Sequence, residues 1–181
     1  TRIGCLVEWI FTRYSIICIS EPGPLEHYQR KAIARMGIQV VGCFRKRSTV
    51  ILLHPKYNIS ETKRSKCSRY AFVKLGSGRN SLGIVSGYLP TGLGKLTNRK
   101  LVESTRGYFR IISYSTDNTR NTVVSTEKNI DTTKYGGQWK RIQCARKFQQ
   151  ITPPYIPTWV GLISGRQIAG STIDTIRTTK G

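Results

Sequence analysis

The chain has 181 residues, of which 30 are Lys or Arg and 9 are Asp or Glu, so its formal net charge is +21. This length is sufficient for one domain with a sizeable hydrophobic core. An excess of cations this large favours polyanionic partners through phosphate contacts and counterion release. The charge therefore indicates a class of partner, nucleic acid, but no reaction, because basic chains without catalytic activity share it.

The cysteine and histidine content makes a structural zinc site unexpected. The 5 cysteines form no C-x-x-C pair, and the chain has only 2 histidines. Several cysteines lie in apolar runs, as reduced core thiols do, which predicts a reducing, intracellular location, with the nucleus as one alternative. No apolar run is long enough to span a bilayer, and no secretory leader or membrane partner is expected. Because the chain begins with Thr1, we expect it to be a piece of a longer protein.

Short apolar runs that stop at proline, glycine or a charged turn predict a series of strands. They cover residues 16–19, 38–41, 49–54, 69–75, 82–89, 108–114, 158–163 and 171–178. The runs at 69–75 and 82–89 flank a Gly-Ser-Gly-Arg-Asn stretch, which predicts an antiparallel hairpin with a five-residue loop.

Three segments predict helices. Residues 24–36 combine a proline in the first turn, one apolar face and a glycine after the last turn. Residues 97–105 predict a short helix closed by Gly107, and residues 138–150 predict a longer one. The apolar stretch 6–14 fits a helix or a strand equally well. The expected fold class is α+β, a two-sheet β-sandwich flanked by helices in four layers, as a single domain over residues 1–181.

Glu21 stands directly after the apolar strand Ile16–Ile19 and before Pro22, at the mouth of the predicted core. A carboxylate there is costly unless a cation or several donors meet it. Oxygen ligands of this kind are those that Mg²⁺ takes. The alternative is an ordinary solvated glutamate at a strand end.

Five stretches, in order, carry a more specific signal. They are ISEP at 19–22, RKRSTVILLHP at 45–55, LGIVSGYLP at 82–90, STDNTRNTVVSTEKN at 115–129, and IPTWVG with GSTIDTIRT at 156–178. Together they resemble the endonuclease domain of a non-LTR retrotransposon, in the endonuclease/exonuclease/phosphatase superfamily with the apurinic/apyrimidinic endonucleases. The matching motifs are a Q-E-P strand end, an arginine-proline-arginine turn, V-S-x-Y-x-P, D-x-N-A-H-H-T-x-W-G-S-T-x-x-N, and P-T-F followed by S-x-I-D-x-x-L.

The resemblance implies roles for particular residues. Glu21 would be the Mg²⁺ ligand, Tyr88 would contact the scissile phosphate, and Asp174 would be a supporting carboxylate. Asp117 and Asn118, in the stretch that resembles the Asp-x-Asn loop, would position the water and the phosphate. Strand ends suit these roles because a rigid core can aim the side chains. The alternatives are a half-buried aromatic side chain for Tyr88 and an ordinary ion pair for Asp174.

The Asp-x-Asn motif does not match cleanly. Aligned without a gap, Thr116 replaces the aspartate and Asn118 keeps the asparagine. With a one-residue insertion, Ser115 stands at the aspartate and Asp117 at the asparagine. The first alignment replaces the aspartate of the motif, and the second replaces both its aspartate and its asparagine.

Other parts of the family pattern have no counterpart. The opening strand with its asparagine and the closing Ser-Asp-His segment are not recognisable, and neither His27 nor His54 stands in a matching context. We therefore expect a Mg²⁺-dependent DNA endonuclease domain with weak or no activity, whose partner is duplex DNA. The resemblance leaves open whether the complete protein carries a reverse transcriptase domain. The alternative is a non-catalytic basic nucleic-acid-binding domain. A small-molecule phosphatase of the same superfamily fits the charge less well.

Overall fold

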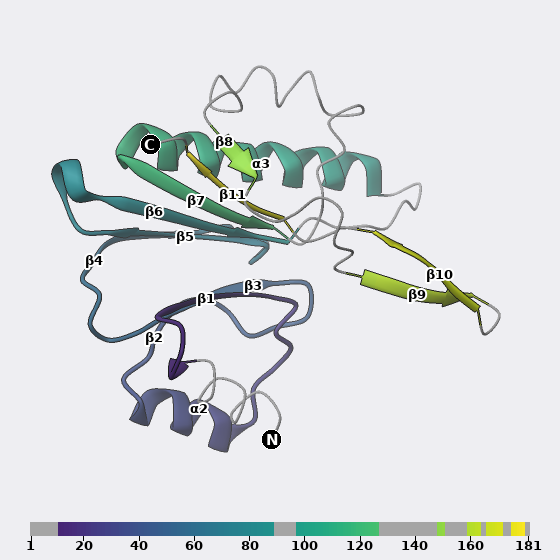
Figure 1. The fold of residues 1–181 in the computed structure, drawn as a ribbon, viewed down its shortest axis with the longest axis horizontal. Helices are drawn as coiled ribbons and strands as arrows, with labels where there is room; N and C mark the ends of the chain where they lie inside the picture. The colour runs from purple at the N-terminus through teal and green to yellow at the C-terminus, as the bar shows by residue number, and fades with distance from the viewer. Residues whose placement is uncertain are drawn as a thin grey trace.

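A computed structural model describes residues 11–88, 97–126, 148–150, 159–163, 166–171 and 175–179 (Figure 1). The helices of this part are α2 (His27–Arg35), α3 (Thr97–Asn118) and the short 3₁₀ helix η1 (Gly78–Asn80). The strands are β1 (Ile16–Ser20), β2 (Gln39–Gly42), β3 (Thr49–Leu53), β4 (Ile59–Arg64), β5 (Tyr70–Leu75), β6 (Leu82–Gly87), β7 (Asn121–Thr126), β8 (Phe148–Gln150), β9 (Trp159–Ile163), β10 (Arg166–Ser171) and β11 (Thr175–Thr179).

Two sheets and two helices stack as four layers. A three-stranded sheet has the order β1-β3-β2, and a six-stranded sheet has the order β4-β5-β6-β7-β11-β8. Helix α2 covers the outer face of the first sheet and α3 covers the outer face of the second (Figure 1). Strands β6 and β7 are parallel and α3 connects them, while the other described pairs are antiparallel. The predicted α+β sandwich flanked by helices is confirmed.

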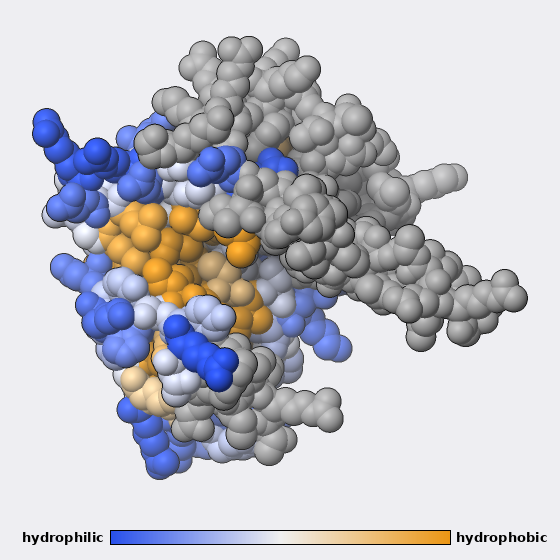
Figure 2. Space-filling view, viewed as in Figure 1, coloured by the Kyte–Doolittle hydropathy of each residue, from blue (hydrophilic) through white to orange (hydrophobic). Residues whose placement is uncertain are grey.

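The hydrophobic core has one cluster between each pair of layers. Between the sheets, Ile51 and Leu53 of β3 pack with residues such as Val73 of β5. The alternate β3 residues Val50 and Leu52 face α2 instead. Because β3 is covered on both faces, its sequence is apolar throughout and does not alternate. Figure 2 shows the result as an apolar band across the middle of the molecule, with hydrophilic side chains above and below it.

Most strands lie where the sequence predicts them. The confirmed segments are 16–20, 39–42, 49–53, 70–75, 82–87 and 159–163, and the first predicted helix is confirmed at residues 27–35. The predicted hairpin is also confirmed, because β5 and β6 pair antiparallel from Tyr70 with Gly87 to Leu75 with Leu82. The structure adds β4, which the sequence analysis missed.

The prediction of a strand at 108–114 and a short helix at 97–105 is wrong, because one helix, α3, covers both. The aromatic and β-branched composition of 108–114 favours a strand. The buried positions instead follow a helical spacing, since Tyr108, Ile112 and Ser115 are all inaccessible to solvent. Gly107 does not end the helix. It lies against the Tyr70 ring, where an added Cβ would be 3.2 Å from a ring carbon.

The stretch 115–121, which resembles the start of the family's Asp-x-Asn loop, does not form a loop. Its first residues form the last turn of α3, and β7 begins at Asn121. Strand β7 is rich in Thr and Ser, although Thr122 and Thr126 are buried. Its polar sequence therefore gives no hydropathy signal for a buried strand.

The C-terminal predictions are partly corrected. Of the predicted helix 138–150, residues 148–150 form strand β8, and the remainder lies outside the described residues. The predicted strand 171–178 is divided, because Ser171 ends β10 and Thr175 begins β11. The thiols of Cys18, Cys43 and Cys67 are free. None of the helices in the described ranges has the length and apolarity of a membrane span.

Candidate active site

The ends of five strands meet at one edge of the sandwich. Ser20, the last residue of β1, pairs with Thr49 at the start of β3. In the other sheet, Gly87 at the end of β6 pairs with Thr126 at the end of β7, which in turn pairs with Thr175 of β11. The Thr49 and Ser86 hydroxyl groups join the two sheets with a hydrogen bond of 2.5 Å. Glu21 and Tyr88, the residues that follow β1 and β6, therefore share this edge, which we call the strand-end edge.

Glu21 is exposed and has an unusual backbone conformation. Its φ is +49°, in the left-handed region that costs an L-residue about 1–2 kcal/mol. Its backbone N–H donates to the Ser48 carbonyl at 2.9 Å, which helps to fix that conformation. Within the described residues no cation forms an ion pair with the Glu21 carboxylate. The carboxylate thus projects to solvent from a fixed backbone.

Tyr88 is more deeply placed than a rim residue, because only 8% of its surface is exposed. Its backbone N–H donates to the Arg69 carbonyl at 2.8 Å. The Tyr88 side chain is thus buried and not half-buried, and the residue lies at the same edge as Glu21. Any contact with a substrate would use the small part of the side chain that reaches solvent.

Backbone strain is concentrated at this edge. The described non-glycine residues with positive φ are Glu21, Arg47 and Ser68. All three adjoin the Ser48–Thr49 peptide. Arg47 directly precedes this peptide. The Ser48 carbonyl accepts from the Glu21 N–H, and the Thr49 N–H donates to the Ser68 carbonyl at 3.0 Å. Strained backbone of this kind persists where the surroundings hold it, and it gathers at functional sites.

A buried polar group lies beneath the edge. Burial raises the pKa of the Cys18 thiol to about 11, although a hydrogen bond with Ser86 opposes the shift. The thiol is therefore protonated at neutral pH and is not a nucleophile. The Thr49 hydroxyl also contacts the Ile19 carbonyl at 3.2 Å. These polar groups contribute to the contact between the sheets, not to chemistry.

The structure does not bring Asp117 and Asn118 to the strand-end edge. They are exposed in the last turn of α3, and Asn118 Nδ2 donates to the Tyr114 carbonyl at 2.8 Å. Together with Arg79 and Arg120 they line a polar hollow of about 570 Å³. This hollow lies at the start of β6 and β7, and β6 alone separates the two ends by roughly 17 Å. Asp174, the remaining predicted site residue, lies outside the described residues.

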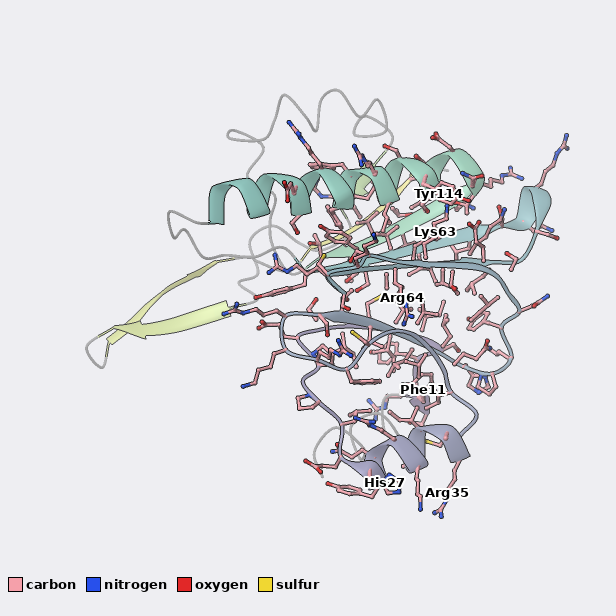
Figure 3. All side chains as sticks on the ribbon, turned by 180° about the vertical axis from the view of Figure 1, so that it is seen from behind. Phe11, His27, Arg35, Lys63, Arg64 and Tyr114 are labelled. Atoms are coloured by element: carbon pink, nitrogen blue, oxygen red, sulfur yellow. The ribbon has the colours of Figure 1, made fainter. Side chains whose placement is uncertain are left out.

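Neither histidine lies at the strand-end edge. The His54 N–H donates to the Ser15 carbonyl, beside the start of β1 at the opposite end of the sandwich. His27 begins α2 in the outer layer, as Figure 3 shows. Because the chain has no other histidine, this edge has no imidazole to act as a general acid or base.

Glu21 provides a minimal fit to Mg²⁺. Mg²⁺ often binds through one or two carboxylates together with substrate phosphates and water. Among the described residues no group of three or more His, Cys, Asp or Glu side chains could hold a metal. Glu21 is the described carboxylate that directly follows a strand of this edge. A nucleic-acid phosphate would have to supply further oxygen ligands.

The sequence analysis missed the second turn of this edge, residues 65–69. It contains Lys66 and Arg69, and its main chain holds Tyr88. The sequence does contain a feature that indicates this turn, because four cations lie from residue 63 to residue 69, immediately before the buried strand β5. A run of this kind usually marks a solvated surface, and only the fold shows that it adjoins Glu21 and Tyr88.

Comparisons with known proteins extend these findings. No protein-family model and no curated protein matches the sequence. Among solved structures, the endonuclease domain of TRAS1, a telomere-specific non-LTR retrotransposon, matches with a TM-score of 0.60 and 13% identity, over 98% of this chain and 78% of that one. D. rerio TDP2 complexed with a single-strand DNA product matches with a TM-score of 0.66 and 11% identity, over 98% and 75% of the chains. An AP endonuclease from Archaeoglobus fulgidus matches with a TM-score of 0.62 and 12% identity, over 98% and 81%.

At this level of identity the likenesses establish a shared architecture. All three proteins are endonuclease/exonuclease/phosphatase-like, and the resemblance seen in the sequence motifs is confirmed at the level of fold. The chain therefore has the endonuclease/exonuclease/phosphatase fold.

Proposed function

We propose that this chain is a retroelement-type endonuclease domain that binds DNA along its strand-end edge and cleaves the phosphodiester backbone there at a low rate. The observation that carries the proposal is the joint placement of Glu21 and Tyr88. Each donates its backbone N–H to a main-chain carbonyl of a neighbouring basic turn. A carboxylate, a tyrosine and several cations at one rigid edge suit the binding of a phosphodiester.

The residues would divide the work as follows. The Glu21 carboxylate would hold Mg²⁺, which supplies Lewis-acid neutralisation of the phosphate when bound. The exposed part of Tyr88 would contact the same phosphate, and the cations of the turns would orient the strand. The low rate follows from the missing imidazole, because one general acid or base contributes typically 10²–10⁴-fold.

Nicking of supercoiled plasmid with Mg²⁺ or with EDTA tests this proposal. We expect slow, Mg²⁺-dependent nicking by the unmodified chain and its loss in Glu21→Gln. The matched control is Asp117→Asn, an equally conservative change at the opposite end, which should keep the activity. Nicking lost in Asp117→Asn but kept in Glu21→Gln would overturn the assignment of the site to the strand-end edge.

A non-catalytic nucleic-acid-binding domain is the second candidate. The observation that favours it is the single carboxylate at the described part of the edge, with no group of metal-ligating side chains there. In that case the unmodified chain would bind DNA, and its nicking would equal that of Glu21→Gln. The same assay therefore separates the two candidates.

A further inference from the structure

We infer that two basic turns form one phosphate-binding rim that carries the nucleic-acid backbone across Glu21 and Tyr88. The first turn contributes Arg45, Lys46 and Arg47, between β2 and β3. The second contributes Lys66 and Arg69, between β4 and β5. The inference rests on the proposed function and adds to it the surface that selects a polyanionic backbone.

The two turns belong to different sheets but are joined directly. The Thr49 N–H, two residues after Arg47, donates to the Ser68 carbonyl at 3.0 Å. Each turn also holds one site residue, since the Ser48 carbonyl accepts from Glu21 and the Arg69 carbonyl accepts from Tyr88. The cations therefore flank the site on both sides and are fixed relative to it by main-chain bonds.

Each turn is organised internally by a serine hydroxyl. Ser48 is 1% exposed, and its hydroxyl accepts the Arg45 N–H at 3.1 Å and lies 2.7 Å from the Cys43 carbonyl. In the second turn the Ser65 hydroxyl accepts the backbone N–H groups of Arg69 and Tyr70, both at 3.1 Å. Because both turns are already ordered, little conformational entropy of the backbone is lost on binding a strand of phosphates.

The rim cations are available to a ligand. Four of the five are exposed and Arg69 is half-buried. Within the described residues the ion pair present joins Lys63 and Glu61, which lie on β4. Figure 3 shows Lys63 turned towards Tyr114 of α3, away from the space between the sheets, where Arg64 lies. The rim cations therefore have no described carboxylate to neutralise them and would exchange counterions for phosphates.

The opposite end of the sandwich offers a matched comparison. Arg79 and Arg120 are exposed there, but the hollow that they line also contains the Asp117 carboxylate. Arg120 is further engaged through its guanidinium with the Arg79 carbonyl at 3.5 Å. Removing these cations changes the net charge without touching the rim.

The experiment measures binding of a fluorescein-labelled DNA duplex by anisotropy over a series of salt concentrations. The rim variants are Arg45→Gln/Lys46→Gln/Arg47→Gln and Lys66→Gln/Arg69→Gln. Their controls, with equal loss of charge, are Arg79→Gln/Arg110→Gln/Arg120→Gln and Arg79→Gln/Arg120→Gln. Each lost phosphate contact lowers the magnitude of the slope of log K against log salt by about 1. We therefore expect this magnitude to fall by about 2–3 in the triple rim variant and by about 1–2 in the double rim variant. At 0.1 M salt this corresponds to roughly 10–500-fold weaker binding, with little change in the controls.

The outcomes separate the rim from the proposed function. Equal effects in rim and control variants, with tight binding by the unmodified chain, would overturn the rim and leave the proposed function standing. A loss confined to one turn would overturn the bridging of the two sheets. If the unmodified chain fails to bind DNA, both the phosphate-binding rim and the proposed function are refuted. Thermal unfolding of every variant is expected to match the parent, because all of these side chains except the half-buried Arg69 are exposed. This measurement shows that a loss of binding is not a loss of fold.

Discussion

Replacing Gly87 with alanine tests the packing that supports the strand-end edge. An added Cβ would lie 2.9 Å from Cδ2 and 3.1 Å from Cζ of the Tyr108 ring, and closer still to Cε2. The backbone at Gly87 does not require positive φ, so the cost is steric. The ring has no room to retreat, because it is inaccessible to solvent and packs on Tyr70 and Phe109 at centroid distances of 5.8 and 5.9 Å.

The expected cost lies in the upper part of the range for overpacked cores, about 2–3 kcal/mol in the free energy of unfolding. For a domain of this size each kcal/mol lowers Tm by roughly 2–4 °C. Urea denaturation followed by tryptophan fluorescence measures the change. Because Tyr88 is the next residue, DNA binding and nicking should weaken as α3 shifts relative to β6.

Tyr108→Leu provides the control, because it removes the ring that the new methyl group meets. In that background Gly87→Ala should cost at least about 1 kcal/mol less, a coupling typical of residues in contact. A Gly87→Ala effect below about 0.5 kcal/mol, or one that simply adds to that of Tyr108→Leu, would refute the packing argument.

Two further predictions concern the residues of β1 and its end. The pKa of Cys18 is raised from 9.0 to about 11 in the folded state, so its contribution to stability is complete below pH 9 and is lost as the pH rises towards 11. The difference in urea midpoint between the parent and Cys18→Ala should shrink over that interval, and a constant difference would contradict the assignment. Glu21→Gly should abolish nicking yet stabilise the fold by roughly 0.5–1 kcal/mol, because relief of the left-handed conformation exceeds the entropy cost of glycine. The Glu21→Ala variant keeps the left-handed backbone conformation and its cost. If the free energy of unfolding of Glu21→Gly is no higher than that of Glu21→Ala, the argument from backbone strain is wrong.

The elements that the sequence predicts well are those whose burial is uniform. Strand β3 is covered on both faces, so its five residues are all apolar or buried and leave no ambiguity. The segment 108–114 is misleading because its aromatic and branched residues favour a strand. Only the spacing of Tyr108 and Ile112 distinguishes the helix, and Gly107 obscures it by resembling a helix end.

The candidate site is predictable only in part for a related reason. Glu21 and Tyr88 follow recognisable apolar strands, so local pattern places both at strand ends. Asp117 could not be placed in this way, because its position depends on where α3 ends and on the path of β7. Strand β7 has a polar sequence although threonines such as Thr122 are buried, and the Thr122 hydroxyl group bonds to other hydroxyl groups. Nothing local to the sequence shows that the second basic turn adjoins the first.

The main chain, not side chains, fixes the two residues at the centre of the edge. The carbonyl groups of Ser48 and Arg69 would still accept from Glu21 and Tyr88 if the side chains on either side were exchanged. A gene encoding such a domain can therefore lose a catalytic side chain by a single codon change and keep the architecture that presents it. The reverse change can restore that side chain to a position already prepared for it. Under the proposed function, a cutting form and a binding-only form of the domain would therefore differ by a few substitutions and not by a change of fold.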